Sequence, residues 1–506
     1  MRTTLQDPAE FQAEQVSSGG YLFQREGTEH APVADDRFGH YLVGGNLYIR
    51  QKASYKPPKS GATNVEAALL AYYKKIRAKL PAQVAAQNYF EYQKPGGGRT
   101  YFQYDARADK LVDIGNSFAY TKEEKDVNKA KVKQGYQADK EAVALVNAFK
   151  TKLNTLKDAQ ELEDLVVSTG VQLWDKFAQR IKGNAGRAGG ALPLDGNLYW
   201  ARLHMMRLLR AELPKNRNLL NHVKSQLPQY MQLLDQASRG MRDAQIGFPA
   251  DRKVKRILIA GFDPFDKLRI NDKARNISAQ VALHFDGQTL GARKKQARIE
   301  AVIFPVSYEA FDRKQVEKFL APYLDKVDAI VTFSQGEAKV IDIERFYANY
   351  RGGAGDNNAQ SARGKIAPGK PAFYETTLPT KKMIPRLGWK NLGRTFGIGK
   401  RQFVYFDQSY LSTQGKENEP FAKRFPGHNF NRPYFPISKI KGSAIRGSGS
   451  NFFSNELPYR VANLIHTKNK QKDLTYGHIH LPHKEHLAKR TVKEVDVLLK
   501  RLIKTL

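Results

Sequence analysis

The pattern of apolar and polar positions changes near the middle of the chain. Between residues 122 and 242, apolar side chains recur at helical spacing, which predicts a series of amphipathic helices. From residue 255 onward, continuous apolar runs such as 255–262 and 329–333 alternate with helical stretches, as is typical of buried parallel strands and their crossovers. We therefore expect an α/β fold: a C-terminal three-layer α/β/α domain with a mostly parallel sheet, and a mainly helical N-terminal domain.

Breaks in this pattern predict the domain boundaries. Residues 1–60 are expected to form an irregular N-terminal arm, although 39–51 alternates enough for a pair of strands. Residues 61–246 are expected to form the mainly helical domain, of unknown function, with a small β-hairpin around a Pro-Gly-Gly-Gly turn. Residues 254–506 are expected to form the α/β domain, which carries an insertion at about 400–441.

Composition is that of a globular protein. The chain has 506 residues, of which 41% are hydrophobic and 26% charged, so it can bury large cores. It contains no apolar run of about 18 residues, so we expect no membrane span. The N-terminus lacks the apolar core of a signal peptide, which leaves cytoplasmic location and export without a signal peptide as alternatives. The absence of cysteine excludes disulfides and a cysteine nucleophile in the chain as written.

The net charge is strongly positive. It is +33 at pH 7, and most of the excess falls after residue 250. A basic face attracts nucleic acid, anionic lipid or an acidic partner, but it is also common on an ordinary solvated surface. The sequence has neither the aromatic and glycine pattern of an RNA-recognition module nor zinc-finger spacing. Nucleic-acid binding therefore remains one of two interpretations of this charge.

Three stretches of the second half supply the residue types of acyl transfer. Glu344 follows an apolar run, Ser454 stands where a helix is expected to begin with Asn455 as its cap, and His480 lies on a short predicted strand. Acyl transfer needs a nucleophile, a base and a group that orients the base, and the positive end of a helix favours a developing anion. Taken singly, these residues are a hydroxyl near a cap, an exposed histidine and a surface glutamate.

Together the three stretches resemble the pyroglutamyl-peptidase I family of cysteine peptidases, also called pyrrolidone-carboxylate peptidases. The matching segments read Glu-Arg-Phe-Tyr-Ala-Asn, Phe-Phe-Ser-Asn-Glu-Leu-Pro-Tyr and Ile-His-Leu-Pro, in the chain order of the family. The resemblance covers about residues 254–505. It implies a peptidase or amidase that removes N-terminal pyroglutamate, with the catalytic residues Ser454, His480 and Glu344.

The family nucleophile is a cysteine, whereas this chain has Ser454. Either a single cysteine was replaced to give an inactive form, or the protein diverged naturally; both explanations stay open. A serine hydroxyl remains protonated where a cysteine would supply thiolate, so we expect slow cleavage or none. The alternatives are an active serine amidase with changed specificity, and a pseudoenzyme whose basic C-terminal half binds nucleic acid or a protein.

The resemblance also implies a substrate pocket. Phe262, Phe265 and Phe452 would enclose the pyroglutamate ring, and Gln335 would read its lactam. An arginine of the family pattern is absent unless Arg351 substitutes for it. The expected partner is a peptide with an N-terminal pyroglutamate or a related amide.

Other features receive weaker interpretations. Four histidines within nine residues invite a metal site, but Pro482 breaks their spacing, and we expect neither a metal nor a cofactor. An enzyme-like C-terminal half behind a non-enzymatic front half resembles the layout of secreted bacterial effectors. On that interpretation the N-terminal half binds a protein partner.

Overall fold

The fold was analysed in a computed structural model of the chain. The structure describes residues 38–43, 46–51, 63–85, 89–93, 99–105, 109–113, 120–186, 191–216, 218–219, 226–265, 274–292, 295–336, 340–384, 403–407, 411–412, 424–426, 442–447, 449, 452–470 and 473–506. The chain divides into two compact units. The first comprises residues 1–120, 150–165 and 207–232, and the second comprises 121–149, 166–206 and 233–506. This division differs from the domain boundaries that the sequence predicts, which lie near residue 60 and at residues 246–254.

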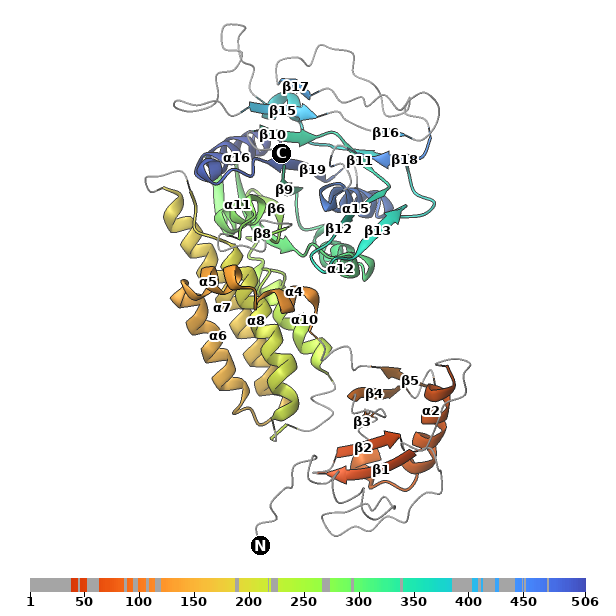
Figure 1. Ribbon diagram of the computed structural model, residues 1–506. Helices are drawn as coiled ribbons and strands as arrows, with labels where there is room; N and C mark the ends of the chain where they lie inside the picture. The colour runs from red at the N-terminus through yellow and green to blue at the C-terminus, as the bar shows by residue number, and fades with distance from the viewer. Residues whose placement is uncertain are drawn as a thin grey trace. The chain divides into compact units, whose positions relative to one another are not determined.

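The first unit contains a five-stranded sheet with one long helix beside it (Figure 1). The elements are β1 (Phe38–Val43), β2 (Asn46–Gln51), α2 (Thr63–Arg77), α3 (Ala82–Ala85), β3 (Tyr89–Gln93), β4 (Arg99–Asp105) and β5 (Lys110–Asp113). The strands follow chain order, and the β3–β4 pair is the predicted hairpin. Strands β1 and β2 form within the expected arm because alternating side chains such as Phe38, Leu47 and Ile49 enter an aromatic core.

Helices dominate the chain from residue 122 to residue 237, as the sequence predicts. They are α4 (Lys122–Asp126), α5 (Ala130–Gln137), α6 (Lys140–Leu153), α7 (Ala159–Ala185), α8 (Gly196–Glu212) and α10 (Leu227–Ala237). Buried apolar residues at spacings of three and four, such as Leu173, Trp174 and Phe177 on α7, account for this pattern.

An eight-stranded sheet forms the centre of the second unit. Its order is β17–β15–β10–β19–β9–β6–β8–β7. The bounds are β6 (Lys255–Phe262), β7 (Gln288–Ala292), β8 (Lys295–Phe304), β9 (Ala329–Gln335), β10 (Val340–Glu344), β15 (Phe403–Asp407), β17 (Arg424–Pro426) and β19 (Thr475–Leu481). Strands β19, β9, β6 and β8 are parallel, whereas β10 runs antiparallel to β19 and β7 runs antiparallel to β8.

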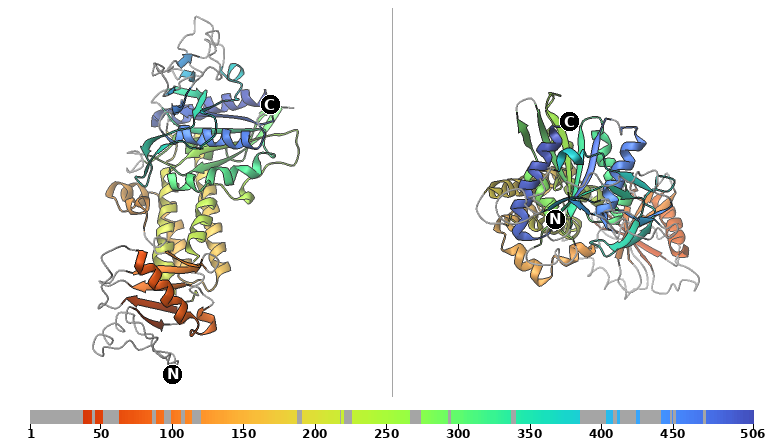
Figure 2. Two further views of the ribbon diagram at one scale, coloured as in Figure 1. Left: turned by 90° about the vertical axis from the view of Figure 1, so that its right-hand side faces the viewer. Right: turned by 90° about the horizontal axis from the view of Figure 1, so that it is seen from above.

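Helices cover both faces of this sheet (Figures 1 and 2). One layer holds α11 (Ile277–Phe285) and α16 (Ala488–Ile503). The other holds α12 (Tyr308–Asp312), α13 (Gln315–Leu320) and α15 (Phe453–Thr467), whose apolar side chains share one core with alternate residues of β6 and β8. Burial on both faces explains the continuous apolar runs in the sequence. The predicted α/β class and mostly parallel sheet are confirmed.

Short elements complete the second unit. They are β11 (Phe346–Ala348), β12 (Arg351–Gly355), β13 (Ser361–Gly364), β14 (Phe373–Glu375), α14 (Thr380–Met383), β16 (Leu411–Ser412) and β18 (Ala444–Arg446). The predicted insertion at about 400–441 contributes β15, β16 and β17, so it extends one edge of the large sheet. The rest of the insertion lies outside the described residues.

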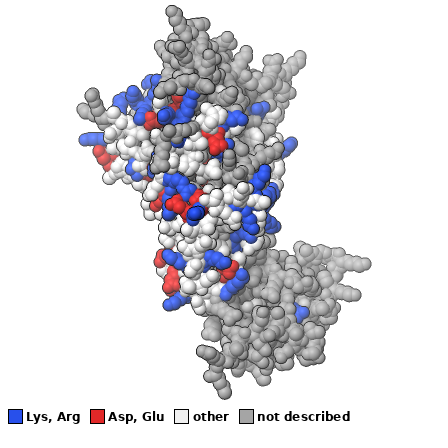
Figure 3. Space-filling model, turned by 60° about the vertical axis from the view of Figure 1, so that its left-hand side comes forward, with Lys and Arg blue, Asp and Glu red and all other residues white. Residues whose placement is uncertain are grey.

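Two findings bear on partners. Among the described residues, no helix has the length and apolar character needed to cross a lipid bilayer. On the face drawn in Figure 3, Lys and Arg side chains lie beside Asp and Glu at several places. Exposed ion pairs of the described residues include Arg313–Glu309 and Lys470–Asp325. Binding of nucleic acid stays a prediction from the charge.

A buried carboxyl on α16 makes stability depend on pH. Glu494 is only 5% exposed, and burial raises its pKa to about 7, against a smaller opposing effect of Arg490. Its pKa in the unfolded chain is about 4.3. Because the folded value is the higher one, the protonated carboxyl contributes stability at low pH that is lost as pH rises through 7.

We therefore expect Glu494→Gln to raise the melting temperature at pH 8 by about 2–4 °C, and by less at pH 5. Thermal unfolding of both forms at the two pH values measures this. An equal rise in melting temperature at pH 5 and pH 8 would mean that the substitution acts through packing and not through ionisation of Glu494.

Candidate active site

A row of polar side chains interrupts the sheet face under α15. Alternate residues of three neighbouring strands form it: Thr332 and Ser334 on β9, Asp342 and Glu344 on β10, and His478 and His480 on β19. Ile330 and Tyr476, which precede the row on β9 and β19, belong to the apolar core that α15 shares. All six are buried except His480, whose side chain is 12% exposed. Polar groups in such a place need partners, because desolvation without hydrogen bonds is costly.

Glu344 and His480 are in direct contact. Nδ1 of His480 is within hydrogen-bond reach of Oε1 of Glu344, whose side chain is 1% exposed. In the antiparallel β10–β19 ladder, Glu344 lies opposite His478, so its contact with His480 is diagonal. A carboxylate in this position holds an imidazole in one orientation and tautomer, as a base in acyl transfer requires.

His478 has a different role in the row. Its Nδ1 lies 2.7 Å from the Thr332 hydroxyl, and its Nε2 lies 2.8 Å from the Ser334 hydroxyl. Burial, and to a lesser degree the neighbouring His480, lower the pKa of His478 well below its usual value. His478 is therefore a neutral imidazole between two hydroxyls, with both ring nitrogens occupied. The sequence marked it only as a metal candidate.

Ser454 is the second residue of α15. It is 6% exposed, and its hydroxyl donates a hydrogen bond to the carbonyl of Gly449 at 2.9 Å. Within the described part of the chain, this hydroxyl makes no hydrogen bond to His480. A Cβ on Gly449 would lie 2.5 Å from the backbone nitrogen of Asn455 and 2.6 Å from the carbonyl carbon of Ser454, so the helix start requires glycine here.

Asn455 does not cap α15, contrary to expectation. Phe452 occupies the cap position, without a side-chain hydrogen bond. The Asn455 amide instead accepts from the backbone nitrogen of Ala348 at 2.8 Å and donates to the carbonyls of Ala348 and Tyr350, each at 3.0 Å. Since Ala348 follows Glu344 by four residues, these bonds tie the start of α15 to the segment after β10.

The predicted substrate residues differ in burial and in their contacts. The rings of Phe265 and Phe452 meet edge to face with centroids 6.0 Å apart, and Phe452 is 48% exposed. Phe262 is only 3% exposed and stacks on Phe311, because it is the last residue of β6 and faces the core. Gln335 ends β9 opposite Leu481 and is half-buried.

Arg351 is engaged elsewhere. Its guanidinium donates to the buried carboxylate of Glu456 and to Asp312, and it lies over the ring of Tyr308. A buried carboxylate such as Glu456 needs this pairing, since an unpaired buried charge is strongly destabilising. Substrate binding by Arg351 would therefore compete with a structural ion pair.

Comparison with known proteins gives two sets of sequence matches. The family model described as "PA0049 N-terminal domain" matches residues 106–231, and "PA0049, C-terminal domain" matches residues 256–374. An uncharacterized protein PA0049 of Pseudomonas aeruginosa is 27% identical over 391 residues, or 63% of this chain and 69% of that protein. The pyrrolidone-carboxylate peptidase of Pyrococcus furiosus is 30% identical over 138 residues, or 26% of this chain and 59% of that protein.

Solved structures of the same kind of peptidase are also similar. A mutant pyrrolidone carboxyl peptidase from Pyrococcus furiosus is 20% identical and covers 50% of this chain and 99% of its own, with a TM-score of 0.33. The enzyme from Thermococcus litoralis is 16% identical and covers 50% of this chain and 94% of its own, also with a TM-score of 0.33. The sequence similarity to a pyrrolidone-carboxylate peptidase extends over 26% of this chain.

Proposed function

We propose that residues 254–506 form a pyroglutamyl-peptidase-like hydrolase domain, with Ser454 as nucleophile, His480 as base and Glu344 as the group that orients the base. The observation that carries this proposal is the diagonal contact of Glu344 with His480, on the sheet face covered by α15, whose second residue is Ser454. The sequence identity of 30% to a pyrrolidone-carboxylate peptidase over 138 residues supports this proposal.

The proposed reaction is acyl transfer. His480 takes the proton of the nucleophile as it attacks the substrate carbonyl, and Glu344 stabilises the imidazolium that forms. The positive end of α15 favours the negative charge on the carbonyl oxygen. His480 then returns the proton to the leaving amine, and water releases the acyl group in a second round.

Serine is a weak nucleophile in this arrangement. Its proton is directed to the carbonyl of Gly449, so attack requires that hydrogen bond to break and a new one to His480 to form. We propose that the chain as written turns over slowly or not at all. Whether Ser454 is a replacement or a natural residue does not change this expectation.

The substrate class follows from the same site. The edge-to-face pair Phe265–Phe452 supplies apolar surface for a flat ring, and the half-buried amide of Gln335 can hydrogen-bond a lactam. We propose a peptide with an N-terminal pyroglutamate or a related cyclic amide. A second candidate, a pseudoenzyme that binds this ligand without cleaving it, is favoured by the Ser454–Gly449 hydrogen bond.

The test compares two reporter amides with the full chain carrying Ser454→Cys. One reporter has an N-terminal pyroglutamyl group; the other has an N-terminal prolyl group, which keeps the five-membered ring but lacks the lactam carbonyl. Release of the reporter amine from the first and not the second is expected. Cleavage of the prolyl reporter alone, or of neither, would contradict the proposed function.

A further inference from the structure

Asp263 lies in the loop that follows β6, two residues before Phe265. It is 2% exposed, although it is a carboxylate. Arg202 donates to both of its oxygens, at 3.1 and 3.0 Å, and Arg239 approaches the second oxygen to 2.7 Å. Arg202 belongs to α8, and Arg239 follows α10. The helical segments thus reach the loop that carries a proposed substrate residue.

Both arginines are themselves held in place. The Arg202 Nε donates to the Ser238 hydroxyl at 2.9 Å. The Arg239 Nε donates to Asp235 at 2.7 Å, and its Nη1 donates to the carbonyl of Ile303 at 3.3 Å. Two arginines and two aspartates balance in charge. A buried group of this kind tolerates only a narrow geometry, because each lost partner leaves an uncompensated charge.

The backbone of the loop is fixed at the same points. The nitrogen of Asp263 donates to the carbonyl of Phe304 at 3.1 Å, and the amide of Asn276 donates to the carbonyl of Asp263 at 2.8 Å. The amide of Asn357 donates to the carbonyl of Pro264 at 3.0 Å. Asp263 is therefore restrained through its backbone and its side chain, and Pro264 through its carbonyl.

The helical segments also pack closely against the α/β domain. At two positions, Gly196 and Gly240, the backbone contacts leave no room for a side chain. A Cβ on Gly196 would lie 2.1 Å from the carbonyl oxygen of Ala274. Gly240 has φ of +73°, and a Cβ there would lie 2.8 Å from the carbonyl oxygen of Ala301. Such contacts indicate a fixed junction and not a flexible linkage.

We propose that Arg202 and Arg239 are positioning residues for the proposed hydrolase: through Asp263 they hold the loop residues 263–265 so that Phe265 meets Phe452. This proposal rests on the proposed function for its catalytic meaning. It assigns the helical segments 166–206 and 233–245 to the substrate site, where the sequence suggested only a separate module for partners.

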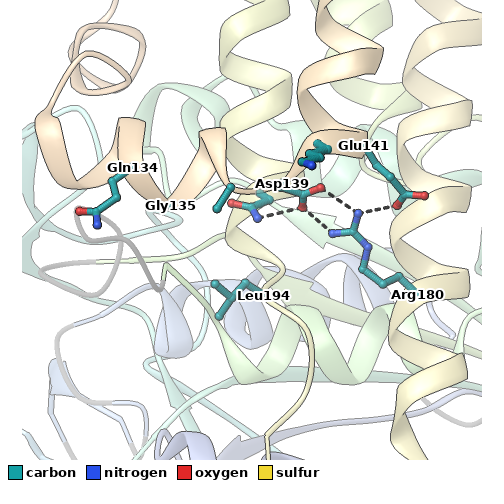
Figure 4. Close-up of a pocket in the computed structure, with 9 residues that line it drawn as sticks. Gln134, Gly135, Asp139, Glu141, Arg180 and Leu194 are labelled. Atoms are coloured by element: carbon teal, nitrogen blue, oxygen red, sulfur yellow. Dashed lines mark hydrogen bonds and ion pairs between the residues drawn. The ribbon is translucent and has the colours of Figure 1, made fainter.

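A second ion-pair group in the same helices provides a matched control. Asp139 accepts from Arg180 and from the amide of Asn197, and Arg180 also pairs with Glu141 (Figure 4). These residues line a cavity of about 680 Å³, and Ser454 and His480 are not among its lining. The Asp139 side chain is 7% exposed and that of Arg180 is 22% exposed, so Asp139→Asn breaks a partly buried ion pair away from the loop.

The experiment introduces Asp263→Asn or Asp139→Asn into the full chain carrying Ser454→Cys. Amide hydrogen exchange of peptides spanning 261–265 is measured, together with the kinetics on the pyroglutamyl reporter. We expect Asp263→Asn to raise loop exchange and KM each by about tenfold with kcat changed far less, because binding is lost when a positioned contact is loosened. Asp139→Asn should leave both values unchanged.

The two proposals fail separately. Unchanged loop exchange in Asp263→Asn overturns the positioning role, even if the reporter is cleaved. Equal loosening of the loop by Asp139→Asn also overturns it, because general destabilisation would then be the cause. If no form cleaves the reporter while only Asp263→Asn loosens the loop, the positioning role stands and the hydrolase proposal fails.

Discussion

Replacing Ser454 by cysteine in the full-length chain is expected to raise kcat/KM on a pyroglutamyl reporter by about 10³-fold or more. A free thiol has a pKa of about 8.5, and the start of a helix together with an imidazolium lowers it, so thiolate is present near neutral pH. The serine hydroxyl gains no such ionisation and donates its proton to Gly449. The gain should therefore lie mainly in kcat.

Ser454→Ala is the control for this comparison, because it keeps the helix start and removes the nucleophile. We expect it to match the parent chain in melting temperature and to show no turnover. The rates are measured by release of a fluorescent amine. Equal turnover by the serine and cysteine forms would show that this position does not carry the reaction.

In the cysteine form, Glu344→Gln is expected to lower kcat by about 10²–10⁴-fold. The glutamine can donate a hydrogen bond to Nδ1 of His480 and so stabilise the tautomer in which the other ring nitrogen carries the proton. The base would then be presented in the wrong form. Burial of Glu344 at 1% exposure means that water cannot substitute for the lost carboxylate.

Glu375→Gln is a suitable control for this variant. Glu375 belongs to β14 and pairs with the fully buried Arg345, the residue directly after Glu344. Melting temperatures of both variants separate stability from catalysis. A similar loss of kcat in both, at equal melting temperature, would argue against a specific role for the Glu344–His480 contact.

Much of the α/β domain could be predicted because its strands are buried on both faces. The runs 255–262 and 329–333 had to be apolar whatever their neighbours in the sheet, so local sequence was sufficient to place them. Strand order was not available from such runs. Strand β10 lies between β15 and β19, and its antiparallel pairing with β19 joins residues more than 100 positions apart in the chain.

The candidate site was predictable in part. The motif segments identified Glu344, Ser454 and His480. The arrangement of Glu344 and His480 in one row was not visible, because it depends on the register of three strands. Phe262 follows Leu258 and Ala260 at a spacing of two and shares their core.

By itself, the sequence determined the fold class of the second unit, the helical character of residues 122–237 and the residue types available for acyl transfer. Each of these depends on local periodicity or on short motifs, which neighbouring residues specify together. Only the tertiary structure decided that Glu344 meets His480, that Asn455 binds the 348–350 segment, and that Arg202 and Arg239 enclose Asp263. These contacts join distant segments, and they arise because buried charged and polar groups must find partners wherever the packed chain brings them.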